Sequence, residues 1–218
     1  MTLVLHGINV SPPVRAVMMV LAALNLPYDF KEVNIMKGEQ LSPEFLKMNP
    51  THTVPVLQDG DFFIGNSHAI AMYLAEKAGD NQLYPNDLQT RAALHQRLFF
   101  DDATLYAAFK TLTTPIFAEG HAEVPAKQRK AVEDTLDILG KLIQEKGWLV
   151  GNSRTIADIC TCATVSTILA LEPTLNVPQN VSQWFKQCEQ LPGYAKDNKP
   201  GVDVISNMFA MKKKANAS

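Results

Sequence analysis

Asn49-Pro-Thr-His-Thr-Val-Pro-Val-Leu57 is a polar loop that passes through a proline into a short apolar segment. Val56 and Leu57 are typical of a buried strand. Because proline cannot donate to a strand ladder, Pro55 belongs at the first residue of this strand, at a sheet edge or at a bulge. A cis Val54–Pro55 bond would mark a tight turn and leave the backbone of Val54 free to pair with another molecule. A trans proline that simply opens the strand is the alternative.

The residues before this loop predict a strand, a helix and a second strand. Residues 3–6 are apolar and stop at Gly7, as a short buried strand does. Ser11-Pro-Pro-Val-Arg-Ala16 then places a polar residue and two prolines ahead of an apolar run that ends at Leu24, which indicates a helix start. Residues 28–34 alternate between apolar and polar side chains. Because a helix separates the two strands, we expect them to pair in parallel.

The residues after the helix complete an α/β domain. A short helix is predicted at 42–48, and strands at 54–58 and 62–64 flank an Asp-Gly-Asp turn, which indicates a hairpin. A serine opens a further helix over 67–78. The sequence therefore predicts a βαβ-α-ββα domain over residues 1–79, which is the plan of a thioredoxin-like domain.

The remainder of the chain predicts a second, all-α domain. Residues 80–87 are polar and are interpreted as a linker, and residues 88–218 contain no convincing strand. Pro115 is expected to kink or end the helix that contains it. Thr155-Ile-Ala-Asp158 resembles a capping box in which Asp replaces the usual Glu or Gln. Helical patterns cover residues 88–118, 125–146, 155–170 and 178–190.

Composition excludes several classes of function. The 218 residues contain 20 Lys and Arg against 22 Asp and Glu, so no overall positive field favours nucleic acid or an anionic membrane. No apolar run approaches the roughly 20 residues of a membrane helix. The first residues lack a charged leader and a cleavage site, and three cysteines fit reduced thiols. We therefore expect a cytoplasmic protein, with Lys212–Lys214 as a solvated end.

Three polar residues of the first domain are candidates for binding or chemistry. Ser11 lies at a helix start, where its hydroxyl could donate to an anion such as a thiolate, helped by the helix dipole. The alternative is that Ser11 merely caps the helix. Ser67, preceded by Asn66, offers a second helix start that suits a carboxylate, and His52 stands as a donor in the loop before Pro55. Together these groups suit a small extended peptide that carries a thiol and carboxylates.

The cysteines do not predict a metal or dithiol site. The first βα turn carries Ser11 and lacks a Cys-x-x-Cys pair, so dithiol redox chemistry is not expected. Cys160 and Cys162 would point to different faces of a helix, and no other Cys or His completes a zinc set. We interpret these residues as core packing, and Cys188 as a buried thiol.

The sequence resembles the glutathione transferases, and most closely the insect delta and epsilon classes, with an epsilon-like character. The resemblance extends over essentially the whole chain. Its most specific combination is Ser-Pro-Pro-x-Arg-Ala with His-Thr-Val-Pro. The motifs that carry it are Ser11-Pro-Pro-Val-Arg-Ala, Leu41-Ser-Pro-Glu-Phe-Leu, Asn49-Pro-Thr-His-Thr-Val-Pro-Val-Leu, Ser67-His-Ala-Ile, Leu83-Tyr-Pro, Leu98-Phe-Phe-Asp, Thr155-Ile-Ala-Asp and Gln190-Leu-Pro-Gly-Tyr.

The resemblance implies glutathione as co-substrate, no metal, and a homodimer. Ser11 would donate to the glutathione sulfur and stabilise its thiolate for attack on a hydrophobic electrophile. The Val54 backbone, exposed by a cis Pro55, would pair with the cysteinyl backbone, and Ser67 would hold the γ-glutamyl carboxylate. His68 would lie near a neighbouring subunit. The residues implied in glutathione binding are Gln40, His52, Thr53, Val54, Pro55, Asn66, Ser67 and His68.

Two residues depart from the family pattern. The family usually has Glu or Asp where this chain has Asn66, and that acid pairs with the γ-glutamyl amino group. Asparagine keeps an acceptor for the ligand but loses the charge, and losing the charge of a charge-assisted bond costs about 1 kcal/mol, or several-fold in affinity. Gln40 replaces a common His near the glycine carboxylate. We expect weaker glutathione binding than is typical of the family, offset in part by Asp101 of the partner subunit or Asp102 of the partner subunit.

The resemblance also implies an electrophile pocket. A pocket rich in aromatic residues and Met suits varied apolar electrophiles. Tyr106, Phe109 and Phe117 could equally be core residues. The implied pocket residues are Pro13, Ile35, Met36, Tyr106, Phe109, Ile116, Phe117, Met208 and Phe209.

Two functions fit the sequence best. The first is an enzyme that conjugates glutathione to hydrophobic electrophiles in detoxification, with Ser11 as its catalytic residue. The second is a weakly catalytic carrier with the same fold, which Asn66 keeps open. A thiol transferase would need a thiol where Ser11 stands, and a narrower biosynthetic or isomerase role is also left open.

Overall fold

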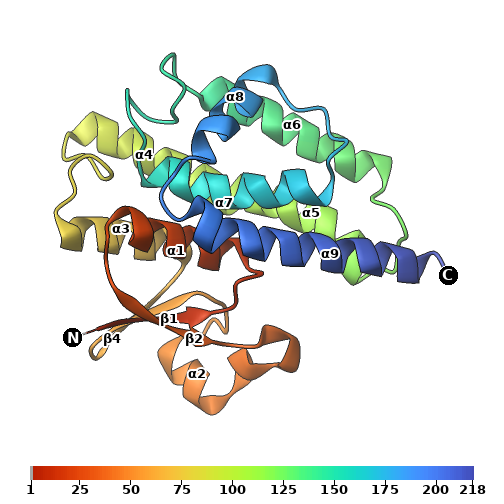
Figure 1. Ribbon diagram of the computed structural model, residues 1–218, viewed down its shortest axis with the longest axis horizontal. Helices are drawn as coiled ribbons and strands as arrows, with labels where there is room; N and C mark the ends of the chain where they lie inside the picture. Colours follow the sequence, from red (N-terminus) through yellow and green to blue (C-terminus); the bar gives the residue numbers. More distant parts are fainter. Residues whose placement is uncertain (1) are drawn as a thin grey trace.

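A computed structural model describes residues 2–218, and a four-stranded mixed sheet forms the base of its first domain (Figure 1). The strands are β1 (Leu3–Gly7), β2 (Tyr28–Glu32), β3 (Val56–Asp59) and β4 (Phe62–Gly65), in the order β2-β1-β3-β4. β1 pairs in parallel with β2, as the intervening helix predicts, and β3 pairs antiparallel with both β1 and β4. The predicted βαβ-α-ββα plan is confirmed.

Helices cover both faces of this sheet. α1 (Pro12–Ala23) and α3 (Ser67–Ala78) lie on the face toward the second domain, and α2 (Pro43–Met48) lies on the other (Figure 1). Successive side chains of a strand point to opposite faces. In β3, Leu57 therefore joins the large core with α1 and α3, whereas Val56 joins a small core with Phe45 of α2.

The second predicted strand is two residues shorter than expected. β2 ends at Glu32, and Val33 turns back into the small core under α2. Two 3₁₀ turns follow, η1 (Ile35–Lys37) and η2 (Glu39–Leu41). Asn34 ends the strand because its side chain accepts hydrogen bonds from the backbone amides at the start of η1. These turns carry Ile35 and Met36 out toward the second domain.

The second domain is all-α, as predicted. α7 is its central helix, and nearly every residue of it is buried. The capping box at its start is present: Asp158 accepts from the backbone amide of Thr155, and also from the amide of Leu149 and the indole of Trp184. The helices are α4 (Leu88–Phe100), α5 (Tyr106–Phe117), α6 (Ala126–Leu142), α7 (Ile156–Leu171), α8 (Gln179–Cys188) and α9 (Lys199–Asn216), with π-helical turns η3 (Asp101–Leu105) and η4 (Tyr194–Asn198).

The helical pattern expected at 88–118 is present, with η3 as a π-helical turn between α4 and α5, and α5 ends two residues after Pro115. The expected solvated end is instead the last turns of α9. Lys213 Nζ lies 2.6 Å from a carboxylate oxygen of Glu123 and 3.7 Å from one of Glu172. The alternating charges and small residues after Lys199 concealed this helix.

A buried arginine joins the two domains. Arg15 of α1 has no solvent exposure, and its Nε donates to Asn198 Oδ1 over 2.9 Å while Nη1 donates to the carbonyl of Asn9 over 2.8 Å. Its Nη2 donates to Thr167 Oγ1 of α7. Burial lowers the pKa of Arg15 to about 9, so the guanidinium remains charged at neutral pH. Gly201 packs against the same loop, because a Cβ there would lie 2.1 Å from the Asn9 carbonyl oxygen.

A second polar contact joins α3 to η3. His68 is buried, and its Nε2 lies 2.8 Å from Asp101 Oδ2, with Nδ1 3.6 Å from Asp102 Oδ1. Burial opposes the charged imidazolium, but the two carboxylates outweigh it and raise the pKa of His68 to about 9. His68 is therefore a cation that holds the two domains together at neutral pH.

His68→Gln is expected to destabilise the protein in a pH-dependent way. Because the folded-state pKa is raised from 6.5 to about 9, the stabilisation from this charge is complete below pH 6.5 and is lost as the pH rises through about 9. The free energy of unfolding should fall by about 3 kcal/mol at about pH 6 and by much less at about pH 10, measured by urea denaturation. The control is His121→Gln, because His121 is an exposed histidine. An equal loss of unfolding free energy at both pH values in His68→Gln would contradict the ion pair.

Candidate functional site

Ser11 stands at the N-cap of α1 with its hydroxyl unused. Its backbone is extended, but its side chain makes no capping hydrogen bond. An N-cap side chain normally accepts from the second or third amide of the helix. Pro13 occupies the second position and has no N–H, and the third amide, that of Val14, is left without this cap. The hydroxyl therefore faces a cleft and is free to donate to a ligand.

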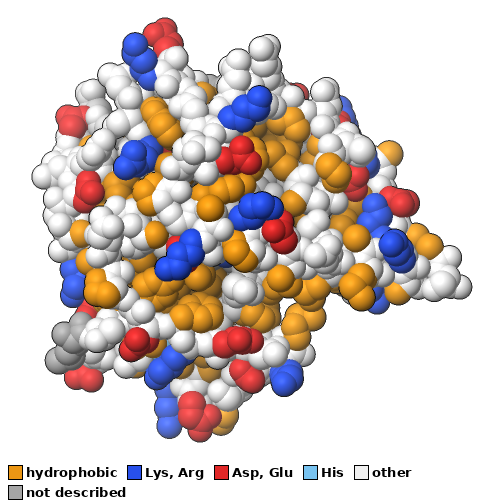
Figure 2. Space-filling view, in the orientation of Figure 1, with side chains coloured by type: hydrophobic (Ala, Val, Ile, Leu, Met, Phe, Trp, Pro, Cys, Tyr) orange, Lys and Arg blue, Asp and Glu red, His pale blue; other side chains and the backbone are white. Residues whose placement is uncertain are grey.

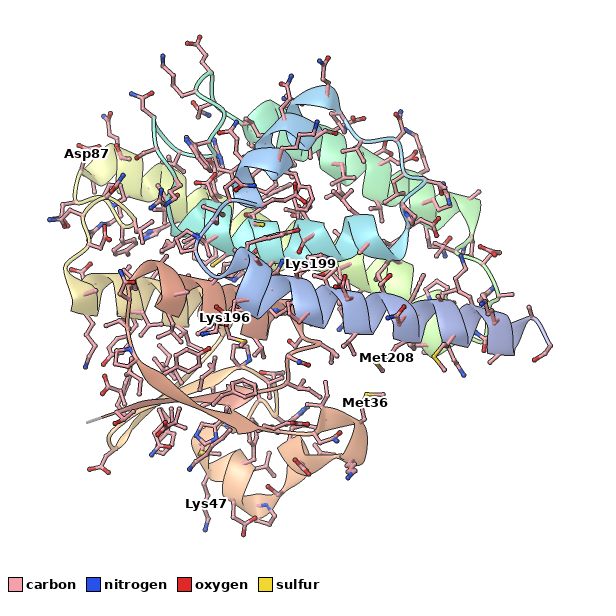
Figure 3. All side chains as sticks on the ribbon, viewed as in Figure 1. Met36, Lys47, Asp87, Lys196, Lys199 and Met208 are labelled. Carbon is pink, nitrogen blue, oxygen red and sulfur yellow. The ribbon has the colours of Figure 1, made fainter. Side chains whose placement is uncertain are left out.

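A large apolar cleft of about 780 Å³ opens beside Ser11, between the two domains. In the space-filling view, hydrophobic side chains edge the hollow below the end of α9, at lower right (Figure 2). Met36 of η1 and Met208 of α9 point toward one another across it (Figure 3). The cleft is lined by Val10, Ser11, Pro12, Ile35, Met36, Tyr106, Phe109, Thr113, Phe117, Ile205, Met208, Met211, Lys212 and Ala215.

A second, smaller cleft of about 200 Å³ lies on the other side of the α1 N-terminus. Pro12 lines the large cleft and Pro13 the small one, and Tyr106 lines both, so the two clefts meet where α1 begins. Its polar lining comes from the loop at residues 53–55, from the start of α3 at residues 66–68, and from the carboxylates of Asp101 and Asp102. It is lined by Pro13, Ala16, Thr53, Val54, Pro55, Asn66, Ser67, His68, Asp101, Asp102, Tyr106 and Thr164.

The loop before β3 is held by a buried asparagine. The Val54–Pro55 bond is cis, and Val54 lines the small cleft. Asn49 Nδ2 donates to the carbonyl of Thr53 over 2.9 Å, and Asn49 Oδ1 accepts from the hydroxyl of Thr51 over 2.8 Å. Sequence reasoning did not assign Asn49 this role, although an asparagine at the start of a proline-containing loop is a known turn signal.

Asn66 is committed to α3. Its Oδ1 accepts from the backbone amides of His68 (3.0 Å) and Ala69 (3.2 Å), which occupies both lone pairs. Its φ of 66° lies in the left-handed region, where asparagine is tolerated. The acceptor that we expected asparagine to offer to a ligand is therefore already used.

Negative charge reaches the small cleft from the same chain. Asp101 and Asp102 line it within their own chain, in addition to the contribution that we expect from a partner subunit. The imidazole of His68, whose Nδ1 lies 3.6 Å from Asp102 Oδ1, holds the pKa of Asp102 below its usual range. Asn66 Nδ2 donates to Asp102 Oδ1 over 3.4 Å, which places this carboxylate beside the residue that lacks the expected charge.

The other predicted binding residues fall into two groups. Thr53, Val54, Pro55, Asn66, Ser67 and His68 line the small cleft, whereas Gln40 and His52 line neither cleft. His52 is exposed at the edge of the loop, with a φ of 48°. Gln40 lies in η2, and its buried Oε1 has no hydrogen-bond partner among the described residues. His68, which we expected near a neighbouring subunit, is paired within its own chain.

Six of the nine predicted electrophile-pocket residues line the large cleft, and three do not. Ile116 has no solvent exposure and belongs to the core of the helical domain. Phe209 is 2% exposed and packs edge-on against Phe117, on the opposite side of α9. Pro13 lines the small cleft instead. The direction of a helical side chain depends on how the helix is rotated about its own axis. For α9, this rotation is fixed only when the helix packs against the rest of the protein.

Sequence reasoning missed several residues of the large cleft. Val10 and Pro12 flank Ser11, and the signal for them was present in the predicted βα turn. Thr113 lies one helical turn after Phe109 on α5, which the i, i+4 spacing could have indicated. The residues missed on α9, where no helix was predicted, are Ile205, Met211, Lys212 and Ala215.

The described residues form neither a metal site nor a membrane span. Within residues 2–218, no group of three or more His, Cys, Asp and Glu side chains is arranged to hold a metal ion. All three cysteines are free and buried, and burial raises the pKa of Cys160 and Cys188. None of the described helices has both the length and the apolar character that a bilayer crossing needs.

Known proteins are similar to this chain in both sequence and fold. Residues 5–82 match the family model of the glutathione S-transferase N-terminal domain, and residues 99–192 match that of the C-terminal domain. Glutathione S-transferase 1 of Manduca sexta is 39% identical over 216 residues, which cover 97% of this chain and 99% of that protein.

Solved structures agree with these matches. A glutathione transferase homologue from Drosophila mojavensis, solved with bound glutathione, has a TM-score of 0.86 at 39% identity and covers 99% of this chain and 97% of its own. An epsilon-class glutathione S-transferase from the housefly, Musca domestica, has a TM-score of 0.89 at 35% identity, with 97% and 98% covered. The chain therefore belongs to the glutathione S-transferase family and is a glutathione transferase, with glutathione as its co-substrate.

Proposed function

We propose that Ser11 activates the thiol of glutathione for conjugation to hydrophobic electrophiles. The unused hydroxyl of Ser11, at the point where the two clefts meet, is the observation that supports this role. A hydrogen bond donated to sulfur favours the thiolate over the thiol, and the positive end of α1 adds to this effect. A thiol with an ordinary pKa of about 8.5 would thereby ionise at neutral pH and become a nucleophile.

Glutathione is proposed to occupy the small cleft. The backbone of Val54 would pair with the cysteinyl residue of glutathione, and the start of α3 at Ser67 would bind the γ-glutamyl carboxylate. Asp102 would supply the negative charge for the γ-glutamyl ammonium that Asn66 lacks. Glutathione bound in this way would direct its thiol toward Ser11 and the large cleft.

The electrophile is proposed to bind in the large cleft. Its aromatic residues and methionines suit varied apolar molecules, and the methionines can adapt to irregular shapes. Holding the electrophile beside the thiolate replaces a bimolecular encounter in water by a reaction between two bound groups. The reaction forms a carbon–sulfur bond, and the electrophile either loses a leaving group or takes up a proton.

A carrier of hydrophobic ligands is the second candidate. Two observations favour it: the acceptor oxygen of Asn66 is already used by backbone amides, and the large cleft is roomy and apolar. A carrier would bind apolar molecules in this cleft with little turnover. The Ser11 experiment below decides between the two functions.

We also propose that two copies associate through α3 and α4. Phe99 of α4 is 64% exposed beside a hollow of about 170 Å³, which Met72 and His95 help to line. An exposed aromatic side chain next to a hollow is the self-complementary arrangement that a two-fold interface requires.

Ser11→Ala is expected to lower kcat/KM with chlorodinitrobenzene by about 10- to 100-fold, because a hydrogen bond to a charged group contributes about 1.5–3 kcal/mol. The loss should be larger at low pH than at high pH, since the thiol pKa returns toward its ordinary value. Stability should change little, because Ser11 makes no capping bond.

Ser42→Ala is the matched control for this experiment. Ser42 caps α2 and accepts from the amide of Phe45 over 3.2 Å, so its loss should lower stability by about 1 kcal/mol and leave turnover intact. If Ser11→Ala behaved like Ser42→Ala, Ser11 would be a cap and the catalytic proposal would fail. Negligible turnover of the wild type, with apolar ligands still bound, would establish the carrier.

Asp102→Asn is expected to raise the KM of glutathione by about 3- to 10-fold, since it removes the charge proposed to face the ammonium. Asn66→Asp in the same background should recover most of this loss, because aspartate can keep the cap of α3 and restores a carboxylate. Steady-state kinetics of the two single variants and the double variant measure the coupling. Additive effects of the two substitutions would contradict the proposed replacement of one charge by the other.

Phe99→Glu is expected to shift the protein from dimer to monomer in sedimentation velocity, because it places a charge in the proposed interface. Ile138→Glu on α6 provides the control, since Ile138 is also apolar and 44% exposed but lies on a different helix. An unchanged sedimentation coefficient for Phe99→Glu would place the interface elsewhere or exclude it.

A further inference from the structure

The large cleft contains a single charged side chain. Of the described residues that line it, Ser11, Tyr106, Thr113 and Lys212 carry polar groups, and Lys212 alone is charged. No carboxylate lines the cleft, and Lys212 forms no ion pair among the described residues. An unpaired ammonium beside apolar walls attracts an anionic group that a ligand brings with it.

The three consecutive lysines of α9 have different surroundings. Lys213 points to the other side of the helix, where it is ion-paired with Glu123 and Glu172. Lys212 and Lys214 are both exposed, and Lys214 borders a separate hollow with Pro173 and Ala217. Lys212 is the member of the run that faces the large cleft. The helical rotation of 100° per residue separates these side chains although they are adjacent in sequence.

Lys212 lies in the part of the cleft that is remote from the start of α9. α9 begins at the Ser11 loop, where Gly201 contacts Asn9. Ile205, Met208 and Lys212 then follow at spacings of three and four residues along the face that lines the cleft. At 1.5 Å per residue, Lys212 is about 16 Å along the helix axis from Gly201. The proposed reactive centre and the positive charge therefore lie well apart along an apolar groove.

We propose that this cleft selects elongated apolar electrophiles that carry an anionic group, such as a carboxylate, at the end remote from the reactive carbon. The proposal rests on the proposed function and names its substrate class. The reactive carbon would lie near Ser11, the apolar body along Ile205 and Met208, and the anion beside Lys212. Met36 and Met211, both largely exposed at the mouth, would fold over the body of the ligand.

An alkenal with a carboxylate at its far end is the simplest member of this class. The glutathione thiolate adds to the β-carbon and forms a carbon–sulfur bond, and the electron pair of the double bond moves toward the carbonyl as an enolate. The enolate takes up a proton, so the product is the sum of the two reactants and no oxidant or leaving group is needed. The carboxylate takes no part in this chemistry and serves only in recognition.

The test compares matched pairs of substrates of increasing chain length. Each pair is a straight-chain trans-2-alkenal and its analogue in which the terminal methyl is replaced by a carboxylate, with the methyl ester as a neutral polar form. The variants are Lys212→Met, Lys212→Arg and, as the control, Lys214→Met. The readout is the ratio of kcat/KM for the acid to kcat/KM for its neutral partner.

Lys212→Met is expected to lower this ratio by about two- to five-fold, which is the range of a partly exposed ion pair. The effect should be largest at the chain length that spans the cleft, and it should shrink at high salt. Lys212→Arg should keep the ratio, and Lys214→Met should leave it unchanged. An equal fall in Lys212→Met and Lys214→Met would mean a general effect of net charge and would overturn the proposal.

Two further measurements separate this proposal from its alternatives. If Lys212→Met raised the KM of glutathione with no change in the ratio, Lys212 would serve the co-substrate and the proposal would be wrong. Displacement of a bound fluorescent probe by nonanoate and by nonanol is measured in the Ser11→Ala background, where no turnover is required. A preference for nonanoate that Lys212→Met abolishes supports the proposal even if Ser11 proves not to be catalytic, and equal binding of both ligands by all variants refutes it.

Discussion

The buried guanidinium of Arg15 is the interaction on which the relative position of the two domains depends. It ties the loop at Asn9, which leads into Ser11, to Asn198 at the start of α9 and to Thr167 on α7. A buried cation requires its full set of acceptors, because an unpaired one costs several kcal/mol. The network therefore tolerates one arrangement of the α1 start against α9, and the two cleft walls are set by the same residue.

The candidate site consists of a polar small cleft and an apolar large cleft. The small cleft contains the charged groups, with His68 neutralising part of the charge of Asp101 and Asp102. The large cleft is apolar except for hydroxyl groups and Lys212. Ser11 lines the large cleft close to its border with the small one, which is where the proposed thiol and electrophile would meet.

The sequence was sufficient for the sheet domain, because short strands, proline-marked helix starts and the hairpin turn are local signals. Its failures were long-range. Asn66 was expected to offer an acceptor to a ligand, but the left-handed backbone at this residue turns its side chain onto the amides of α3. The sequence also did not predict the π-helical turn that brings Asp101 and Asp102 into the small cleft of their own chain, where Asp102 contacts Asn66.

The sequence alone placed Ser11 at the start of α1, but it left open whether the hydroxyl caps the helix, because the amide of Val14 is available to a capping serine. It also indicated the loop at residues 53–55 that lines the small cleft and the capping box of α7. Tertiary structure alone decided which face of α9 meets the cleft, and so whether Phe209 or Met208, and Lys213 or Lys212, would line it. Neighbouring residues of a helix point in directions about 100° apart, so their roles depend on how the helix packs. The packing of α9 involves its own Gly201 and the distant Arg15 of α1.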